Sequence, residues 1–112
     1  MPKSDRVYLE HMIQAGGKAM AIAQKAGPAG YEKDETVRLA LTHLLQIIGE
    51  AARRLSPEFC ARHPEIPWRD IVGMRHKVVH DYLDVDEDIV WETIDEELAP
   101  LVETLKKFLP QT

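Results

Sequence analysis

One stretch of the chain constrains the fold more than any other, because its apolar side chains recur at intervals of three and four residues. That spacing lines them up along one face of an α-helix and leaves the opposite face polar. The pattern predicts a long amphipathic helix from Asp34 to Leu55, whose apolar face other helices must cover. The stripe consists of Val37, Leu41, Leu44, Leu45, Ile48, Ala52 and Leu55.

Helices are also predicted on either side of this element. A looser helical pattern runs from Asp5 to Ala26, and the segment Gly27-Pro28-Ala29-Gly30 is expected to end it. After the long helix, Ser56 has the side chain of an N-cap and Pro57 suits the first helical position. We therefore expect a short third helix that ends near His63.

The second half of the chain predicts two more helices. Pro67 or Trp68 can begin a fourth, and Asp86 can cap a last one. Pro100 falls inside the last apolar stripe, so a kink or a break is expected there. No run alternates at period two between turn signals, so no strands are expected. The prediction is one all-α domain, residues 1–112, built as a bundle of four main helices plus a short one.

Charge narrows the possible partners. A net charge of −5 over 112 residues argues against broad, nonspecific adhesion to nucleic acid. The charge is uneven, however, and a local basic cleft in an acidic protein would favour a small, selected RNA segment. The basic cluster is Arg69, Arg75, His76, Lys77 and His80, and the acidic run is Asp84, Asp86, Glu87, Asp88, Glu92, Asp95, Glu96 and Glu97.

Two further features concern location and redox chemistry. No apolar run reaches the roughly 18 residues of a membrane span, and residues 1–6 lack the apolar stretch of a signal peptide. We expect a cytoplasmic protein that does not enter a membrane. The single Cys60 cannot form an internal disulfide, and we assign it no chemical role.

The residues richest in chemistry lie between positions 74 and 82, at the predicted end of the fourth helix. In a helix, His76 and His80 would share one face, and Tyr82 would share the face of Arg75. Arginine offers a charged fork for phosphate oxygens, and an imidazole can move a proton near neutral pH. A helix C-terminus would also favour the protonated form of His80. The combination suits a phosphodiester substrate.

The same residues allow other interpretations. His76 and His80, four residues apart, resemble two metal ligands on a helix, but no third ligand is clearly placed and no glutamate stands between them as in the zinc protease motif. An arginine and a histidine at this spacing also fit a solvated face or an ion-pair site. Glu50 could pair with an arginine across the bundle or merely face water, and a structural salt bridge to Arg75 or Arg69 is the first expectation.

From Ile48 onward the sequence resembles the HepT-like group of the HEPN superfamily, a set of small helical bundles. The superfamily signature is an arginine followed, after four to six residues, by a histidine; here these are Arg75 and His80. In HepT-like members a tyrosine two residues further on extends the signature, and Tyr82 matches it. The runs that carry the resemblance are Ile48-Gly49-Glu50-Ala51-Ala52, Leu55-Ser56-Pro57-Glu58, residues 64–75, His80-Asp81-Tyr82 and Val90-Trp91.

The resemblance implies the toxin of a toxin–antitoxin pair, a metal-independent endoribonuclease that needs no cofactor and acts as a homodimer. Arg75 and His80 would be catalytic. The implied partners are an RNA substrate and a minimal nucleotidyltransferase antitoxin, which silences the toxin by transferring AMP from ATP to Tyr82.

One position departs from the family pattern. His76 stands where the family usually has a polar residue, most often Asn. We include it among the candidate catalytic residues because its imidazole could take part in proton transfer. The rival interpretation is a non-catalytic, dimeric binding partner and modification substrate of a nucleotidyltransferase.

Overall fold

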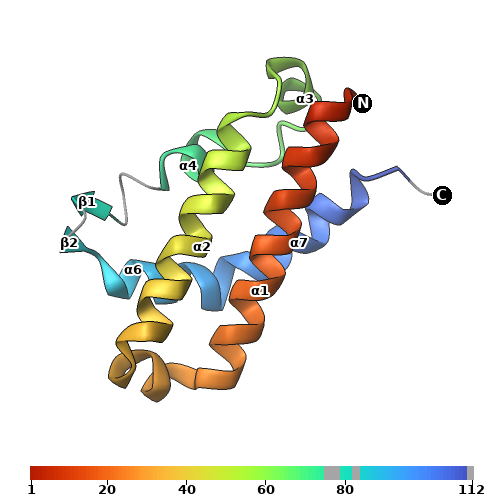
Figure 1. The fold of residues 1–112 in the computed structure, drawn as a ribbon. Helices are drawn as coiled ribbons and strands as arrows, with labels where there is room; N and C mark the ends of the chain where they lie inside the picture. The colour runs from red at the N-terminus through yellow and green to blue at the C-terminus, as the bar shows by residue number, and fades with distance from the viewer. Residues whose placement is uncertain (75–78, 82–83, 111–112) are drawn as a thin grey trace.

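A computed structural model describes residues 1–74, 79–81 and 84–110. Two long helices lie side by side as a hairpin, and a segmented C-terminal helical arm packs across them (Figure 1). In chain order the elements are α1 (Lys3–Lys33), α2 (Glu35–Arg53), α3 (Pro57–Arg62), α4 (Trp68–Val72), β1 (Val79–Asp81), β2 (Asp84–Val85), α6 (Glu87–Glu92), η1 (Thr93–Glu97) and α7 (Leu98–Lys107).

The predicted amphipathic helix is confirmed as α2. The side chain of Asp34 accepts a 2.9 Å hydrogen bond from the backbone N–H of Thr36, so it satisfies a donor that the first turn of a helix leaves unpaired. Among the described residues, Leu41, Leu45 and Ile48 have almost no solvent exposure. The apolar face of α2 therefore forms the centre of the core.

The first helix differs from its prediction beyond Ala26. Gly27 breaks the helical geometry with φ 69° and ψ 173°, but helical structure resumes at Pro28 and continues to Lys33. Glycine adopts positive φ without a steric penalty, and proline suits the first turn of a new helical segment. The expected break is therefore present, whereas the expected end of the helix lies several residues later.

The C-terminal arm begins as predicted, with the Asp86 side chain accepting a 3.1 Å hydrogen bond from the backbone N–H of Ile89. Pro100 does not end this arm. A proline lacks an N–H and crowds the carbonyl four residues earlier, which here belongs to Glu96. The hydrogen-bonding pattern changes at that point to the π-helical segment η1, and the arm then continues as α7.

The fourth helix is much shorter than predicted. It ends at Val72, where the N–H of Gly73 bonds to the carbonyl of Arg69 at 2.9 Å. The chain forms an antiparallel ladder a few residues later, in which Val79 pairs with Val85. Among the described residues the fold is helical as predicted except for this short two-stranded ladder, which the sequence did not indicate, and α4 is a second short helix instead of a main one. Valine favours extended backbone because it is β-branched, so the prediction of a helix was weak at Val79.

A buried carboxylate fastens α3 to the rest of the bundle. Asp5 is 1% exposed, and its two oxygens accept hydrogen bonds from the N–H (2.8 Å) and the hydroxyl (2.7 Å) of Ser56. The same hydroxyl oxygen accepts from the N–H of Phe59, so Ser56 is the predicted N-cap of α3. In the described ranges, no helix combines the length and the apolar character needed to cross a membrane.

Candidate functional site

The predicted site residues fall on a segment that the structure describes only in part. Arg75, His76 and Tyr82 lie outside the described residues. His80 is the middle residue of β1. His80 itself is therefore not in a helix, contrary to the prediction, whereas the predicted geometry of Arg75, His76 and Tyr82 falls on residues outside the described part of the chain. The described elements before and after this segment can still be examined.

Before the segment, α4 lies unusually close to α2. A Cβ atom added to Gly49 would stand 3.1 Å from the carbonyl oxygen of Ile71 and 3.8 Å from that of Val72. Gly49 therefore permits the close approach of α4 to α2. At the other end of α4, the indole N–H of Trp68 donates a 2.9 Å hydrogen bond to the carbonyl of His63. These two contacts fix the helix that leads into the motif.

After the segment, the start of α6 is held by the α1–α2 hairpin. The hydroxyl of Tyr31 donates a 2.8 Å hydrogen bond to the backbone carbonyl of Glu87, and Arg38 Nε lies 3.3 Å from a Glu87 carboxylate oxygen. Burial of the phenol, with the Glu87 carboxylate nearby, raises the pKa of Tyr31 to about 12. Both flanks of the motif segment are thus anchored to the long helices.

A polar hollow on α2 borders the point where α4 ends. Glu50 forms salt bridges with Arg53 (2.6 Å) and Arg54 (3.2 Å) on its own helix. Hydrogen bonds from Arg53 and Arg54 lower the pKa of Glu50 to about 2, and the bond to Glu50 raises the pKa of the Arg53 guanidinium group. Within the described part of the chain, the salt bridges of Glu50 run along α2, so the predicted bridge to Arg69 is wrong. The hollow is lined by His43, Gln46, Ile47, Gly49, Glu50, Arg53, Val72 and Gly73.

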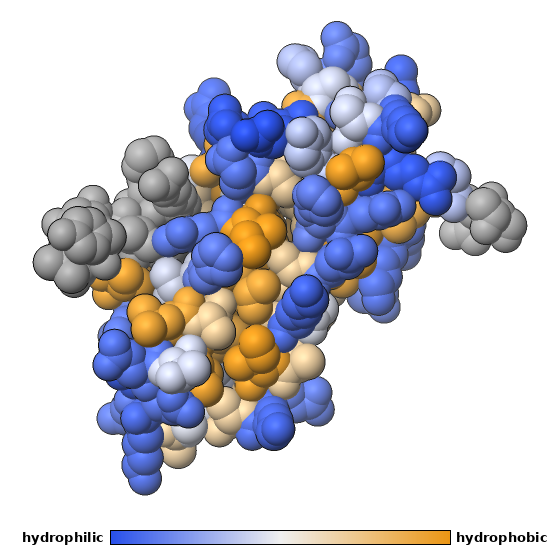
Figure 2. All heavy atoms as spheres, in the orientation of Figure 1, coloured by the Kyte–Doolittle hydropathy of each residue, from blue (hydrophilic) through white to orange (hydrophobic). Residues whose placement is uncertain are grey.

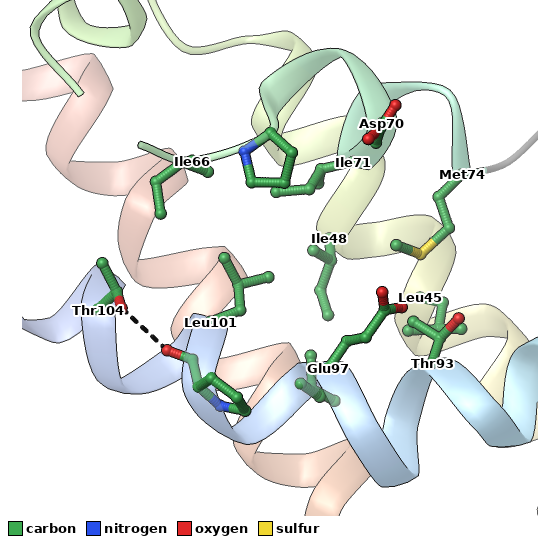
Figure 3. Close-up of a pocket in the computed structure, with 13 residues that line it drawn as sticks. Leu45, Ile48, Ile66, Asp70, Ile71, Met74, Thr93, Glu97, Leu101 and Thr104 are labelled. Carbon is green, nitrogen blue, oxygen red and sulfur yellow. Dashed lines mark hydrogen bonds between the residues drawn. The ribbon is translucent and has the colours of Figure 1, made fainter. Parts of the chain in front are cut away.

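A second cavity, of about 340 Å³, opens between α4 and the C-terminal arm, and we call it the α4–α7 slot. Figure 3 shows aliphatic side chains facing each other across it and the Glu97 side chain extending into it from η1. Met74, which immediately precedes Arg75 in the sequence, lines one end. The full lining is Leu45, Ile48, Ile66, Pro67, Asp70, Ile71, Met74, Thr93, Glu97, Leu98, Pro100, Leu101 and Thr104.

The sequence did not reveal this slot. Glu97 belongs to a run of acids that is typical of a solvated helix face, and Leu101 belongs to the apolar stripe of the last helix. Pro100, which lines the slot, gave an indirect indication, because it predicted irregular helical structure at this point of the chain. A partly open, mostly apolar cavity with a few polar groups has the character of a small-molecule site.

Comparison with known proteins places the chain in a family. The model of the family described as "Ribonuclease HepT-like" matches residues 12–108. The relative named "Putative RNase TTE0752", from Caldanaerobacter subterraneus subsp. tengcongensis, is 36% identical over 107 residues that cover 96% of each chain. "Probable ribonuclease HepT" of Thermococcus cleftensis is 33% identical over 101 residues, 90% of this chain and 92% of the relative. No solved structure gives a significant match. The chain therefore belongs to the HepT-like ribonuclease family, as its motifs predicted.

Proposed function

We propose that this protein is the toxin of a toxin–antitoxin pair and cleaves RNA as a metal-independent endoribonuclease. One observation carries the proposal: a member of the HepT-like ribonuclease family retains the complete Arg75-x4-His80-x-Tyr82 motif in its sequence. The names of its relatives, which describe them as RNases, support RNA as the substrate.

The chemistry of these side chains suits RNA cleavage without a metal. The 2′-hydroxyl of RNA attacks the adjacent phosphorus when a base removes its proton, and the 5′-oxygen leaves when an acid protonates it. The products are a 2′,3′-cyclic phosphate and a 5′-hydroxyl end. We assign His80 to one of the two proton transfers and His76 to a supporting role in them. Arg75 holds the phosphate and stabilises the charge that develops on its oxygens.

The proposal includes a homodimer, which would supply two copies of each imidazole. One subunit could then provide the base and the other the acid. The surface offers support for association, because hydrophobic side chains gather in a band along the middle of the face seen in Figure 2. Leu39 of α2 is 61% exposed. Exposed apolar patches of this kind are typical of protein–protein contact.

Regulation would act through Tyr82 and a minimal nucleotidyltransferase antitoxin. Transfer of AMP to the phenol oxygen would add a negatively charged phosphate and a large base within the motif segment. That phosphate would compete with the RNA phosphate for Arg75, so the modified protein would lose RNA binding as well as cleavage.

The first test is incubation of the purified, unmodified protein with total RNA in EDTA, followed by mapping of the fragment ends. The wild type should leave cyclic phosphate ends. His80→Ala should cleave roughly 10²–10⁴-fold more slowly, because it lacks one proton-transfer group. His11→Ala, which changes an exposed histidine of α1, is the matched control and should cleave like the wild type.

The second candidate function is that of a non-catalytic partner and modification substrate of a nucleotidyltransferase. The presence of His76 in place of the usual Asn favours this candidate. Intact RNA in every lane, together with AMP transfer to Tyr82 by an antitoxin, would support this candidate and contradict the nuclease. A wild type that cuts only when divalent metal is added would contradict metal independence.

A further inference from the structure

We propose that the α4–α7 slot binds a nucleobase of the RNA beside the cleaved phosphate, and that its chemistry selects guanine. The inference rests on the proposed ribonuclease function and adds to it a substrate preference and a residue, Glu97, that would determine it. Three properties of the slot carry the inference: its shape, its polar group and its place in the chain.

The slot has the shape of a site for a flat apolar group. Ile66 and Ile71 stand on the α4 side, Leu101 stands opposite on α7, and Ile48 lies at the bottom between them (Figure 3). A nucleobase is flat, and its two faces are its least polar surfaces. Proteins that recognise single-stranded RNA splay such bases out of the strand and contact their faces and edges; in this slot the aliphatic side chains would contact the faces. The volume of about 340 Å³ is at the lower end of the range for small-ligand pockets.

The slot also carries a carboxylate: Glu97 contributes to the lining while remaining exposed to solvent. Glu97 extends into the slot from η1, the π-helical segment that precedes Pro100. Single π-helical turns inside α-helices occur frequently at functional sites, because they redirect side chains. Here the irregular turn carries the acid that would meet the ligand. Asp70 adds a second carboxylate to the lining, so a phosphate would be repelled from the slot.

The carboxylate selects among the four bases. Guanine presents two neighbouring N–H donors, its N1–H and its 2-amino group, which can form two parallel hydrogen bonds with one carboxylate. Adenine and cytosine place a ring acceptor next to their amino group, and uracil has one N–H between two carbonyls. Each of these three would set an acceptor against a carboxylate oxygen. A good two-bond pairing separates bases by about tenfold or more in affinity.

The slot also adjoins the motif in the chain. Met74 lines it, and Arg75, the residue proposed to hold the phosphate, is the next residue. This adjacency in sequence leads us to infer that the base in the slot and the phosphate that is cleaved belong to one nucleotide. The slot would therefore determine which phosphodiester bond is presented for cleavage.

The experiment measures binding without cleavage. Full-length His80→Ala protein is titrated with the 3′-monophosphates of guanosine, adenosine, cytidine and uridine, and methyl NMR signals report binding. We expect guanosine monophosphate to bind about tenfold more tightly than the others. Glu97→Gln should abolish this preference. Glu96→Gln, the same change on the preceding exposed residue outside the slot lining, should retain it.

A second variant tests whether nucleotide binding needs the free volume of the slot. Leu101→Trp should fill the slot and reduce binding of all four nucleotides, while its NMR spectrum confirms that the protein remains folded. Equal binding of the four nucleotides would overturn the inference, as would a guanine preference that survives Glu97→Gln. The inference would also be overturned if no nucleotide bound and the methyl signals of Met74 and Leu101 shifted with protein concentration. The slot would then be a protein interface.

The outcomes separate this inference from the nuclease proposal. Guanine-selective binding to a wild type that leaves RNA intact in EDTA would support the pocket and contradict the nuclease. Cleavage of RNA with no preference for guanine at the mapped ends, in wild type and Glu97→Gln alike, would support the nuclease and overturn the pocket.

Discussion

The hydroxyl of Tyr31, near the end of α1, donates a hydrogen bond to the backbone carbonyl of Glu87 at the start of α6, across 56 residues of sequence. The Tyr31 ring also packs against Trp91, with 5.0 Å between ring centroids. Because α6 is the helix that follows the motif segment, this contact ties the downstream side of the proposed site to the long helices. Its contribution can be measured in two ways.

Tyr31→Phe should lower the free energy of unfolding by about 0.5–1.5 kcal/mol, because it removes one buried hydrogen bond while keeping the ring and its packing. Urea denaturation of both proteins at pH 7 gives the difference. A value that does not change would mean that another donor, such as water, replaces the phenol at the Glu87 carbonyl.

The same contact predicts a dependence of stability on alkaline pH. Burial raises the pKa of Tyr31 from 10.0 to about 12, so the folded state favours the neutral phenol. The resulting stabilisation is fully present below pH 10 and is lost as pH rises toward 12. Between these values the wild type should lose more free energy of unfolding than Tyr31→Phe. The variant still contains the other groups that titrate at alkaline pH, so the difference between the two proteins reports Tyr31 alone. Parallel curves for the two proteins would contradict the raised pKa.

Asp5→Asn should destabilise the protein by about 1–3 kcal/mol, because the amide can no longer accept both hydrogen bonds from Ser56 and leaves a buried donor without its partner. Thermal unfolding with a matched control, Asp95→Asn on the exposed side of η1, isolates the effect of burial. If the two variants lost equal free energy of unfolding, the link between α1 and α3 would contribute no more stability than an exposed carboxylate.

The parts of the fold that could be predicted from the sequence depend on local chemistry. Ser56 and Asp86 cap helices because their side chains accept hydrogen bonds from N–H groups only three residues away. Gly27 breaks α1 because it adopts a positive φ, and it is alone in doing so among the described residues. Such features need no knowledge of distant contacts, so the pattern of residues is sufficient.

The parts that could not be predicted depend on contacts between distant segments. The valines around β1 fit a buried helix face or a strand, and periodicity alone cannot separate these two interpretations. The α4–α7 slot requires Met74 and Glu97, which are distant in sequence, to line one cavity, and no sequence spacing reports that arrangement. Glu50 could have been predicted better, since Arg53 and Arg54 follow at the spacings that place side chains together on a helix.

Two adjacent glycines of α1 offer a matched test of packing. A Cβ at Gly16 would approach Val102 Cγ2 to 2.5 Å, whereas a Cβ at Gly17 would meet nothing within 4 Å. Gly16→Ala should cost about 1–3 kcal/mol, because buried Val102 is stiff at χ1 and cannot easily move away. Gly17→Ala should raise stability by about 0.5–1 kcal/mol through helix propensity. Denaturation midpoints that shift in the same direction would contradict the packing of α1 on α7.

Gly49→Ala tests whether the position of α4 matters for activity. The new methyl group would lie 3.1 Å from the carbonyl oxygen of Ile71, so α4 must move by a few tenths of an ångström, and the gain in helix propensity offsets part of the strain. We expect little net change in stability but roughly a two- to tenfold loss of RNA cleavage, because small displacements of positioning elements lower rates strongly. Gly17→Ala, where the added Cβ would meet nothing within 4 Å, is the control and should cleave at the wild-type rate. A Gly49→Ala protein that is clearly less stable yet fully active would show that the close contact between α2 and α4 serves folding alone.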